Sequence, residues 1–278
     1  MRFAMRLPRV YPLIPAALGI GALYLVVGAP LSGTGMNRDG AIVTRSIRTD
    51  QHIDLPLDPT HADAPKPVGS IAPVRIATRE GANDALKGLT AGIAPLDVVA
   101  FGQRPDLVWD QASRTLTERD DVIAYEVTAE DLPAAADRLA LTRGLAALAP
   151  QGEQAVRLQP DIRAFKAGQR LTVQVPDVLG RTAIVFVVSG DGTLQFLYPG
   201  RTDPATVPTA DLSFAVDVSA PYGADQIVAL TATGDSGDLV TALRRLDRRK
   251  AAGGALGLIE AAPKGSLKLG SVRILTQP

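Results

Sequence analysis

The sequence predicts an α+β chain with a dominant all-β part. We expect a C-terminal antiparallel β-sandwich, immunoglobulin-like, a smaller mixed α/β region before it, and one N-terminal transmembrane helix. Three observations lead to this prediction. From residue 155 onward, short apolar runs alternate with polar residues between Gly and Pro, as antiparallel strands do. Residues 73–154 mix strand-like runs with a helical pattern, and Tyr11 to Leu31 carries no charge over a length that can cross a bilayer.

The centre of the predicted sandwich is the stretch RTAIVFVVSGDGTLQFLYP, Arg181 to Pro199. Ala183 to Val188 is an unbroken apolar run rich in β-branched residues, which favours a strand buried on both faces. Ser189-Gly190-Asp191-Gly192 supplies residues that tolerate a hairpin turn, and the residues after it alternate as in a half-buried strand. Pro199 ends the pairing because proline lacks the backbone donor.

The other predicted strands of residues 155–278 follow the same period of two. They are Val156–Leu158, Leu171–Val175, Leu212–Val218, Gln226–Thr233 and Ser271–Leu275. A helical insert is expected near residues 237–250, where apolar residues recur at helical spacing. This apolar stripe comprises Leu239, Val240, Leu243 and Leu246.

The mixed region, residues 73–154, contains three predicted strands and two predicted helices. The strands are Val74–Thr78, Leu96–Phe101 and Val122–Val127. A short helix is expected over Ala82–Leu89, and a longer one starts near Asp131, whose side chain we expect to cap the first turn. The buried face of the longer helix is predicted to hold Leu132, Ala135, Ala136 and Leu139.

The N-terminal residues predict a membrane anchor and a tether. Arg2, Arg6 and Arg9 precede the charge-free segment, so residues 1–31 are expected to form a cytoplasmic basic end and a span over residues 11–31. The alternative is a signal peptide cleaved after Ala29, which gives a secreted protein. Residues 32–72 are rich in proline and are expected to form an extended linker. The predicted location is a bacterial inner membrane, crossed once, with the C-terminal domain in the periplasm.

Composition narrows the chemistry that the chain can perform. It has no cysteine, which excludes disulfides, thiolate metal sites and cysteine nucleophiles. Basic and acidic residues balance at 29 each, so no overall field argues for a nucleic-acid partner. The only histidines, His52 and His61, fall in the predicted linker without a carboxylate cluster beside them. We therefore predict no metal, no cofactor and no catalytic residue.

Three phrases of the C-terminal half resemble a known family. They are FKAGQRLTV (Phe165–Val173), VFVVSGDGTLQFLYP (Val185–Pro199) and PYGADQIVAL (Pro221–Leu230). Over about residues 155–275 the chain resembles a bacterial domain of unknown function that is often attached to a caspase-like peptidase domain. The resemblance implies a non-catalytic module associated with such a peptidase. No site residue follows from it, because the family has no established chemistry.

Two features are candidates for contact with a partner. Trp109 is the only tryptophan, and on the surface it would suit an anchor, whereas packing in the core is the alternative. The other candidate is the basic run RRLDRRK, which contains Arg244, Arg245, Arg248, Arg249 and Lys250. It suits an acidic partner or acidic lipid, and the alternative is a solvated helix face.

Two patterns that suggest catalysis have simpler explanations. Gly234 to Asp238 reads GDSGD, like the nucleophile loop of chymotrypsin-like proteases, but no histidine lies in a predicted folded region. We expect a loop in which Asp235 or Ser236 caps the next helix. The neighbouring carboxylates at Asp120–Asp121 and Glu130–Asp131 flank element ends, where such residues commonly cap or are solvated.

The sequence as a whole predicts a non-catalytic, membrane-anchored binding or accessory module outside the cytoplasm. Its partners are the inner membrane and an unknown protein, with a caspase-like peptidase as the candidate. A structural subunit of an envelope assembly is the main alternative, and a serine hydrolase using Ser236 is the other.

Overall fold

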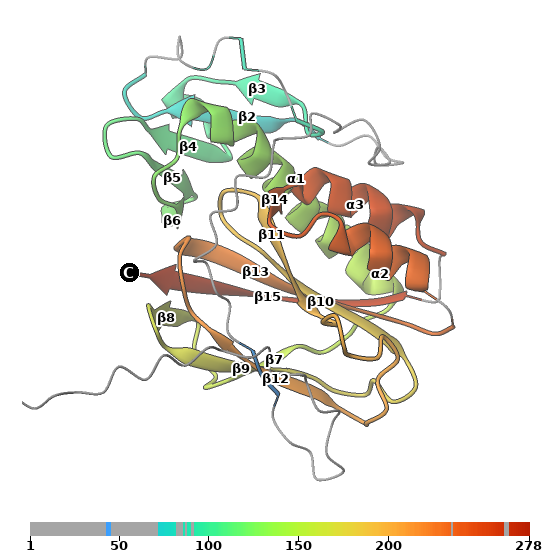
Figure 1. Ribbon diagram of the computed structural model, residues 1–278. Coiled ribbons are helices and arrows are strands. Elements are labelled where there is room, and N and C mark those ends of the chain that lie inside the picture. Colours follow the sequence, from blue (N-terminus) through green and yellow to red (C-terminus); the bar gives the residue numbers. More distant parts are fainter. Residues whose placement is uncertain are drawn as a thin grey trace, which may run out of the picture. The chain divides into compact units, whose positions relative to one another are not determined.

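The computed structural model describes residues 43–45, 72–81, 86, 88–89, 92–234, 236–263 and 267–278, all within one compact unit, Gly33–Pro278 (Figure 1). The predicted transmembrane segment 11–31 lies outside these residues, as do most of the predicted linker 32–72 and of the predicted helix Ala82–Leu89. No described helix combines the length and the apolar character that a membrane span requires.

The prediction of a mostly β chain with few helices is confirmed. The strands are β1 (Val43–Arg45), β2 (Val74–Thr78), β3 (Leu96–Val98), β4 (Leu107–Asp110), β5 (Thr115–Glu118), β6 (Asp121–Ala124), β7 (Arg157–Gln159), β8 (Ala164–Lys166), β9 (Arg170–Val175), β10 (Thr182–Val188), β11 (Thr193–Tyr198), β12 (Leu212–Asp217), β13 (Gly223–Ala232), β14 (Arg249–Lys250) and β15 (Leu267–Gln277). The helices are α1 (Leu132–Leu148), α2 (Gly237–Arg244) and α3 (Ala252–Ala261), with single 3-10 turns at Phe101–Gln103, Ala129–Asp131 and Ala149–Gln151.

The described strands form two sheets. The smaller sheet has the order β1-β12-β9-β7, and the larger has the order β14-β11-β10-β13-β6-β5-β4-β2-β3, with β15 on β13 and β8 on β15. In the larger sheet, β13 and β6 are joined by a single residue pair, Gly223 with Ala124. This one pair connects the strands of the mixed region to those of the C-terminal half.

Seven predicted strands of the C-terminal half are present, with ends that shift by a few residues. They are β7, β9, β10, β11, β12, β13 and β15, and β8 and β14 were not predicted. In the mixed region, β4 and β5 were missed, and the strand predicted over Leu96–Phe101 ends at Val98. The strand predicted over Val122–Val127 ends at Ala124, because Glu126 adopts a left-handed conformation (φ 59°).

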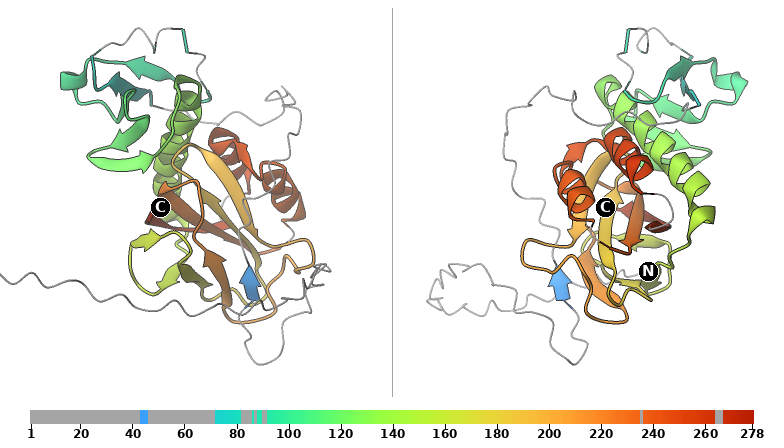
Figure 2. Two further views of the ribbon diagram at one scale, coloured as in Figure 1. Left: turned by 60° about the vertical axis from the view of Figure 1, so that its left-hand side comes forward. Right: turned by 90° about the vertical axis from the view of Figure 1, so that its right-hand side faces the viewer.

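Two apolar cores lie on the two faces of β10, whose residues are all buried. Ala183, Val185 and Val187 face the smaller sheet and share a core with residues of β9 and β12. Ile184, Phe186 and Val188 face the opposite way, into a core shared with α1, α2 and α3. These helices lie beside β10 in the ribbon views (Figures 1 and 2). The prediction of a strand buried on both faces is confirmed.

Helix α1 spans two cores. Its first half places Leu132, Ala135, Ala136 and Leu139 in a third core with β2, β4 and β5, as predicted. Its second half places Leu141 and Leu145 in the core beneath β10. Helix α1 therefore links the mixed region to the C-terminal sheet.

The predicted cap of α1 is wrong. Asp131 occupies the position before α1, but its side chain makes no capping hydrogen bond to that helix. Its carboxylate instead accepts hydrogen bonds from the backbone N–H (2.8 Å) and the hydroxyl (2.9 Å) of Thr128. The physical reason is that a 3-10 turn, Ala129–Asp131, precedes α1 without a break, so the chain begins to coil one turn earlier.

The turn between β10 and β11 is packed inside the molecule. Gly192 has φ +86°, and its N–H donates to the Ser189 carbonyl, as in a type I turn followed by a left-handed glycine. A Cβ on Gly190 would lie 1.5 Å from the Ile123 carbonyl oxygen, and one on Gly192 would lie 2.4 Å from the Ala134 carbonyl oxygen. The glycines therefore allow the turn to contact both β6 and the start of α1.

The substitution Gly190→Ala tests this close approach. We expect it to lower the free energy of unfolding by about 1–3 kcal/mol. The new methyl group would clash with the Ile123 carbonyl oxygen, which can move only if the backbone of β6 moves with it. Gly102→Ala is the control, since nothing lies within 4 Å of the Cβ it would add. Urea denaturation of both purified variants measures the difference, and equal midpoints would show that the turn does not pack as described.

Candidate functional site

The basic run after α2 lies against the outer edge of β11. The Arg248 N–H donates to the Leu194 carbonyl (2.7 Å), and Asp247 Oδ1 accepts the Phe196 N–H (2.8 Å). Residues Arg249 and Lys250 then pair with β11 as strand β14. Arg248 has φ +59°, so the chain turns sharply at this point. These contacts fix the backbone from which the basic side chains project.

Arg244 serves an internal role. Its Nη2 donates to the carbonyl oxygens of Pro199 (2.8 Å) and Gly200 (3.4 Å), at the end of β11. Its guanidinium carbon also lies 5.3 Å from the centre of the Phe196 ring, within the range of a cation–π contact. Arg244 therefore joins α2 to the end of the hairpin and is not a free contact residue.

Lys250, whose side chain is 42% exposed, also pairs with other residues of the chain. Its ammonium forms ion pairs with Asp131 before α1 and, at 3.6 Å, with Asp191 in the hairpin turn. Partial burial opposes the charge of Lys250, but the two carboxylates outweigh it and raise the pKa of Lys250. Lys250 thus fastens the turn between β10 and β11 to the start of α1.

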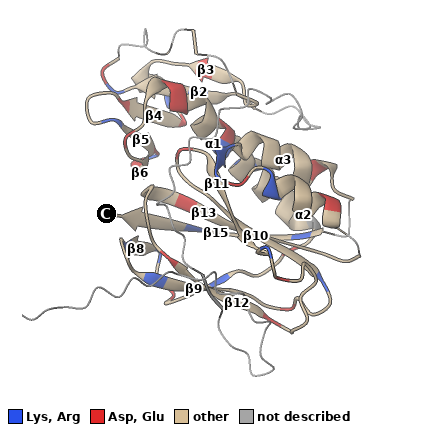
Figure 3. Cartoon of the chain, in the orientation of Figure 1, with Lys and Arg blue, Asp and Glu red and all other residues tan. Residues whose placement is uncertain are grey.

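The remaining three residues form what we call the arginine turn: Arg245, Arg248 and Arg249. All three side chains are exposed. Among the residues that the structure describes, no acidic side chain pairs with any of them within 4.0 Å. Elsewhere on the described elements, basic and acidic residues are interspersed (Figure 3). The arginine turn can therefore offer three guanidinium groups, each a planar multiple donor, to an anionic surface.

Trp109 does not reach the surface. It is 4% exposed, packs in the core of the mixed region, and its Nε1 donates to the Val127 carbonyl at 3.2 Å. The indole is thus satisfied inside the fold, and the core role given above as the alternative is the observed one. The reason is that Trp109 lies in β4, with its side chain on the buried face of the sheet.

A charged cluster that was not predicted lies where β6 and β13 meet, with Arg138 buried and Asp121 exposed. Arg138 of α1 is 1% exposed, with Nη1 3.4 Å from Glu118 Oε2 and Nη2 donating to the Ala224 carbonyl (3.1 Å). Arg273 of β15 pairs with Glu118 (3.4 Å) and with Asp121 (3.2 Å). In the sequence, the signal for Arg138 was its position directly before Leu139, one of the apolar positions of the predicted helix.

Asp225 of β13 lies next to this cluster and is 7% exposed. Its Oδ2 accepts a hydrogen bond from the Thr276 hydroxyl (3.2 Å), while Oδ1 has no partner among the described residues. Burial raises the pKa of Asp225 to about 7, although the hydroxyls of Thr276 and Ser189 and the charge of Arg138 oppose the shift. An aspartate inside the otherwise apolar run of β13 was the signal in the sequence.

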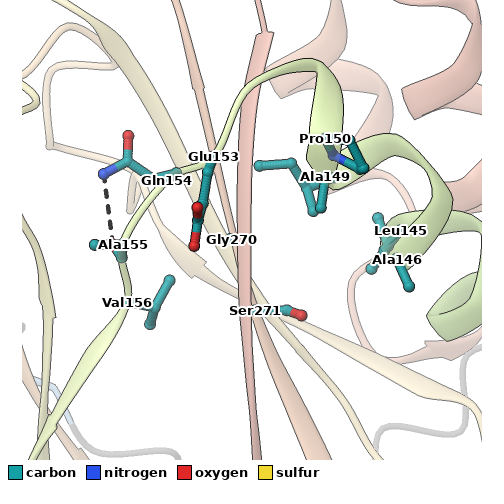
Figure 4. Close-up of a pocket in the computed structure, with 11 residues that line it drawn as sticks. Leu145, Ala146, Ala149, Pro150, Glu153, Gln154, Ala155, Val156, Gly270 and Ser271 are labelled. Atoms are coloured by element: carbon teal, nitrogen blue, oxygen red, sulfur yellow. Dashed lines mark hydrogen bonds between the residues drawn. The ribbon is translucent and has the colours of Figure 1, made fainter.

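A hollow of about 560 Å³ lies between the end of α1 and β15 (Figure 4). Its lining combines apolar side chains with three polar residues, Glu153, Gln154 and Ser271. Gln154 is engaged elsewhere, because its amide donates to the Pro176 carbonyl (2.7 Å) and accepts from the Thr231 hydroxyl (2.7 Å). The carboxylate of Glu153 and the hydroxyl of Ser271 are the other polar side-chain groups at the hollow.

The other sequence candidates are dispersed. Ser236 precedes α2 but makes no capping hydrogen bond, so the predicted cap by Ser236 is absent. Asp235, His52 and His61 lie outside the described residues. Asp121 starts β6 and Asp131 precedes α1, so these carboxylates stand at element ends as expected. Within the described part of the chain, no group of three His, Cys, Asp or Glu residues is placed to hold a metal ion.

Comparison with known proteins adds no relative: no protein-family model matches this chain, and no curated protein matches it either.

The substitution Lys250→Gln tests the ion pairs of Lys250. We expect it to lower the free energy of unfolding by about 1 kcal/mol, since Asp131 and Asp191 would lose their shared cation at a partly solvated site. Arg249→Gln, one residue away and without a described ion pair, is the matched control and should leave the midpoint of urea denaturation unchanged. If the two variants unfold alike, Lys250 does not fasten the turn.

Proposed function

We propose that the chain is a non-catalytic accessory module that binds an acidic surface of a partner protein through the arginine turn. The observation that carries the proposal is the exposure of Arg245, Arg248 and Arg249 on a backbone held by hydrogen bonds to β11. A rigid backbone lowers the entropy lost when the three side chains engage a partner. Charged groups at an exposed surface also raise the association rate and select for complementary charge.

The choice of a protein over a lipid surface rests on the apolar residues of α2. Val240 and Leu243 are buried in the core beneath β10, so α2 has no described apolar face to insert among acyl chains. Three arginines alone would give about 3 kcal/mol of attraction to an anionic lipid surface, which is weak for stable binding. An acidic protein surface can add hydrogen bonds with defined geometry.

The location, partner and fold type complete the proposal. We infer an inner-membrane anchor over residues 11–31 with the folded part in the periplasm, from the basic residues that precede this charge-free segment. A caspase-like peptidase is the candidate partner, because residues 155–275 resemble the domain attached to such enzymes. The immunoglobulin-like assignment is supported by the core that β9 and β12 share with β10, β13 and β15.

The binding test reverses the charge of the arginine turn. A photo-reactive residue at Leu239, which is half-buried in α2, the helix that leads into the arginine turn, would give an adduct with one distinct protein in intact cells. The triple variant Arg245→Glu, Arg248→Glu, Arg249→Glu should weaken the measured affinity for that protein roughly tenfold to a hundredfold.

The control makes the same change in net charge elsewhere, with Arg157→Glu, Lys166→Glu and Lys268→Glu, three exposed residues outside the arginine turn. These substitutions should leave the adduct intact. A loss of the adduct in both variants would contradict a local site. A ladder of self-adducts would instead favour the structural subunit of an envelope assembly.

The location is tested by protease protection. Protease added to intact spheroplasts should degrade the folded part, residues 73–278, and leave a fragment that stays with the membrane. A control protein of the cytoplasm must remain intact in the same sample. Full protection of the C-terminal residues would contradict a periplasmic location.

A further inference from the structure

The strand pairing between β6 and β13 is limited to one residue pair and has a buried carboxyl beside it. Gly223 and Ala124 form the only residue pair that joins β13 to β6. Gly223 lies so close to β6 that an added Cβ would be 2.0 Å from the Ile123 carbonyl oxygen. Asp225 follows two residues later on β13. We call this region, Ile123–Ala124 with Gly223–Asp225, the junction.

The charges around the junction are already balanced without Asp225. Arg138 comes from α1, Glu118 from β5, Asp121 from β6 and Arg273 from β15, and these two cations and two anions pair with each other. An ionised Asp225 would therefore add a negative charge without a free counter-charge. The charge of Arg138 favours ionised Asp225, but its Nη atoms are engaged with Glu118 and the Ala224 carbonyl, and no hydrogen bond joins Arg138 to Asp225 among the described residues.

The other groups that face Asp225 do not compensate either. The Thr276 hydroxyl of β15 donates one hydrogen bond, and Ser189 at the end of β10 is a neutral hydroxyl. Asp191 in the hairpin turn is a further negative charge nearby, and it is partly offset by Lys250. Burying a carboxylate whose Oδ1 has no partner among the described residues is costly, whereas burying the neutral acid costs much less.

We propose that Asp225 makes the junction a pH-dependent contact, which is closed while its carboxyl group is protonated and which opens more readily once that group ionises. Opening means that β6 and the residues around Gly223 separate enough for water to reach the carboxylate. Because only one residue pair joins β6 to β13, this pairing can open locally while α1 and the two sheets stay folded.

The direction of the pH effect follows from the two states. In the closed state the pKa of Asp225 is raised to about 7 by burial, and in the open state it returns to the ordinary value of an aspartate, about 4. Between these values the closed state binds the extra proton. Raising the pH from about 4 to about 7 therefore favours opening, roughly tenfold in the equilibrium constant per pH unit, and no further change follows above about 7.

Hydrogen exchange of the full-length protein, followed by mass spectrometry, measures this opening. After correction for the intrinsic pH dependence of exchange, opening of the junction should increase on the order of a hundredfold between pH 5 and pH 7 and then level off. Peptides from β9 and β12 in the smaller sheet serve as the internal reference and should show no such rise.

Two variants separate the proposal from a merely structural role. Asp225→Asn is neutral at every pH and should give a flat profile at the junction. Asp121→Asn removes an exposed carboxylate of the same cluster and should keep the wild-type profile. A flat wild-type profile would overturn the proposal even if Asp225→Asn failed to fold, and so would a slope that persists in Asp225→Asn.

Discussion

The structure depends on the burial of β10 on both faces. Alternate side chains of one strand, Val185 and Phe186 among them, enter two different cores, one shared with the smaller sheet and one with the three helices. Fully burying a large apolar side chain contributes about 1.5–3 kcal/mol, so this strand accounts for a substantial part of the stability of both layers. A register slip would exchange the two sets of side chains, so the pairing of β10 with β11 and β13 is strongly specified.

The hairpin that begins with β10 also carries the link to the mixed region. Its turn meets Ile123 of β6 and Ala134 of α1 at distances that only glycine allows, and Lys250 holds the same turn from the side of β14. Helix α1 adds a second link, because its two halves lie in different cores. The same short turn therefore contacts β6, α1 and Lys250, next to the charged residues around the junction.

The apolar pattern was enough to predict the central hairpin and the neighbouring strands, because burial of alternating residues leaves a direct trace in the sequence. One irregularity was also visible there: Leu197 falls among polar positions, and it is the extra residue of a bulge between the pairs Val185–Tyr198 and Phe186–Phe196.

Helix α3 could not be predicted, since Gly253, Gly254 and Gly257 disfavour an isolated helix. Gly253 fits because the helix lies against α1, where a Cβ on Gly253 would be 2.8 Å from Asp137 Oδ2. Among the candidate contact residues, the sequence could not separate Arg244 and Lys250 from the arginine turn, because their partners lie about 45 and 119 residues away. Arg138 and Asp225 were missed for the same reason, since the Ala224 carbonyl lies 86 residues from Arg138 and Thr276 lies 51 residues from Asp225.

The segment Leu246–Lys250 has a consequence for how molecules of this kind can associate. The amide of Phe196 already donates to Asp247, and the carbonyl of Leu194 already accepts from Arg248. These backbone groups at the outer edge of β11 are therefore not free to pair with a strand of another chain. A neighbouring chain that approached here would meet guanidinium groups before it met any main-chain donor. Polymer growth by continuous sheet extension is thereby disfavoured on this side, and recognition by side chains is what the margin permits.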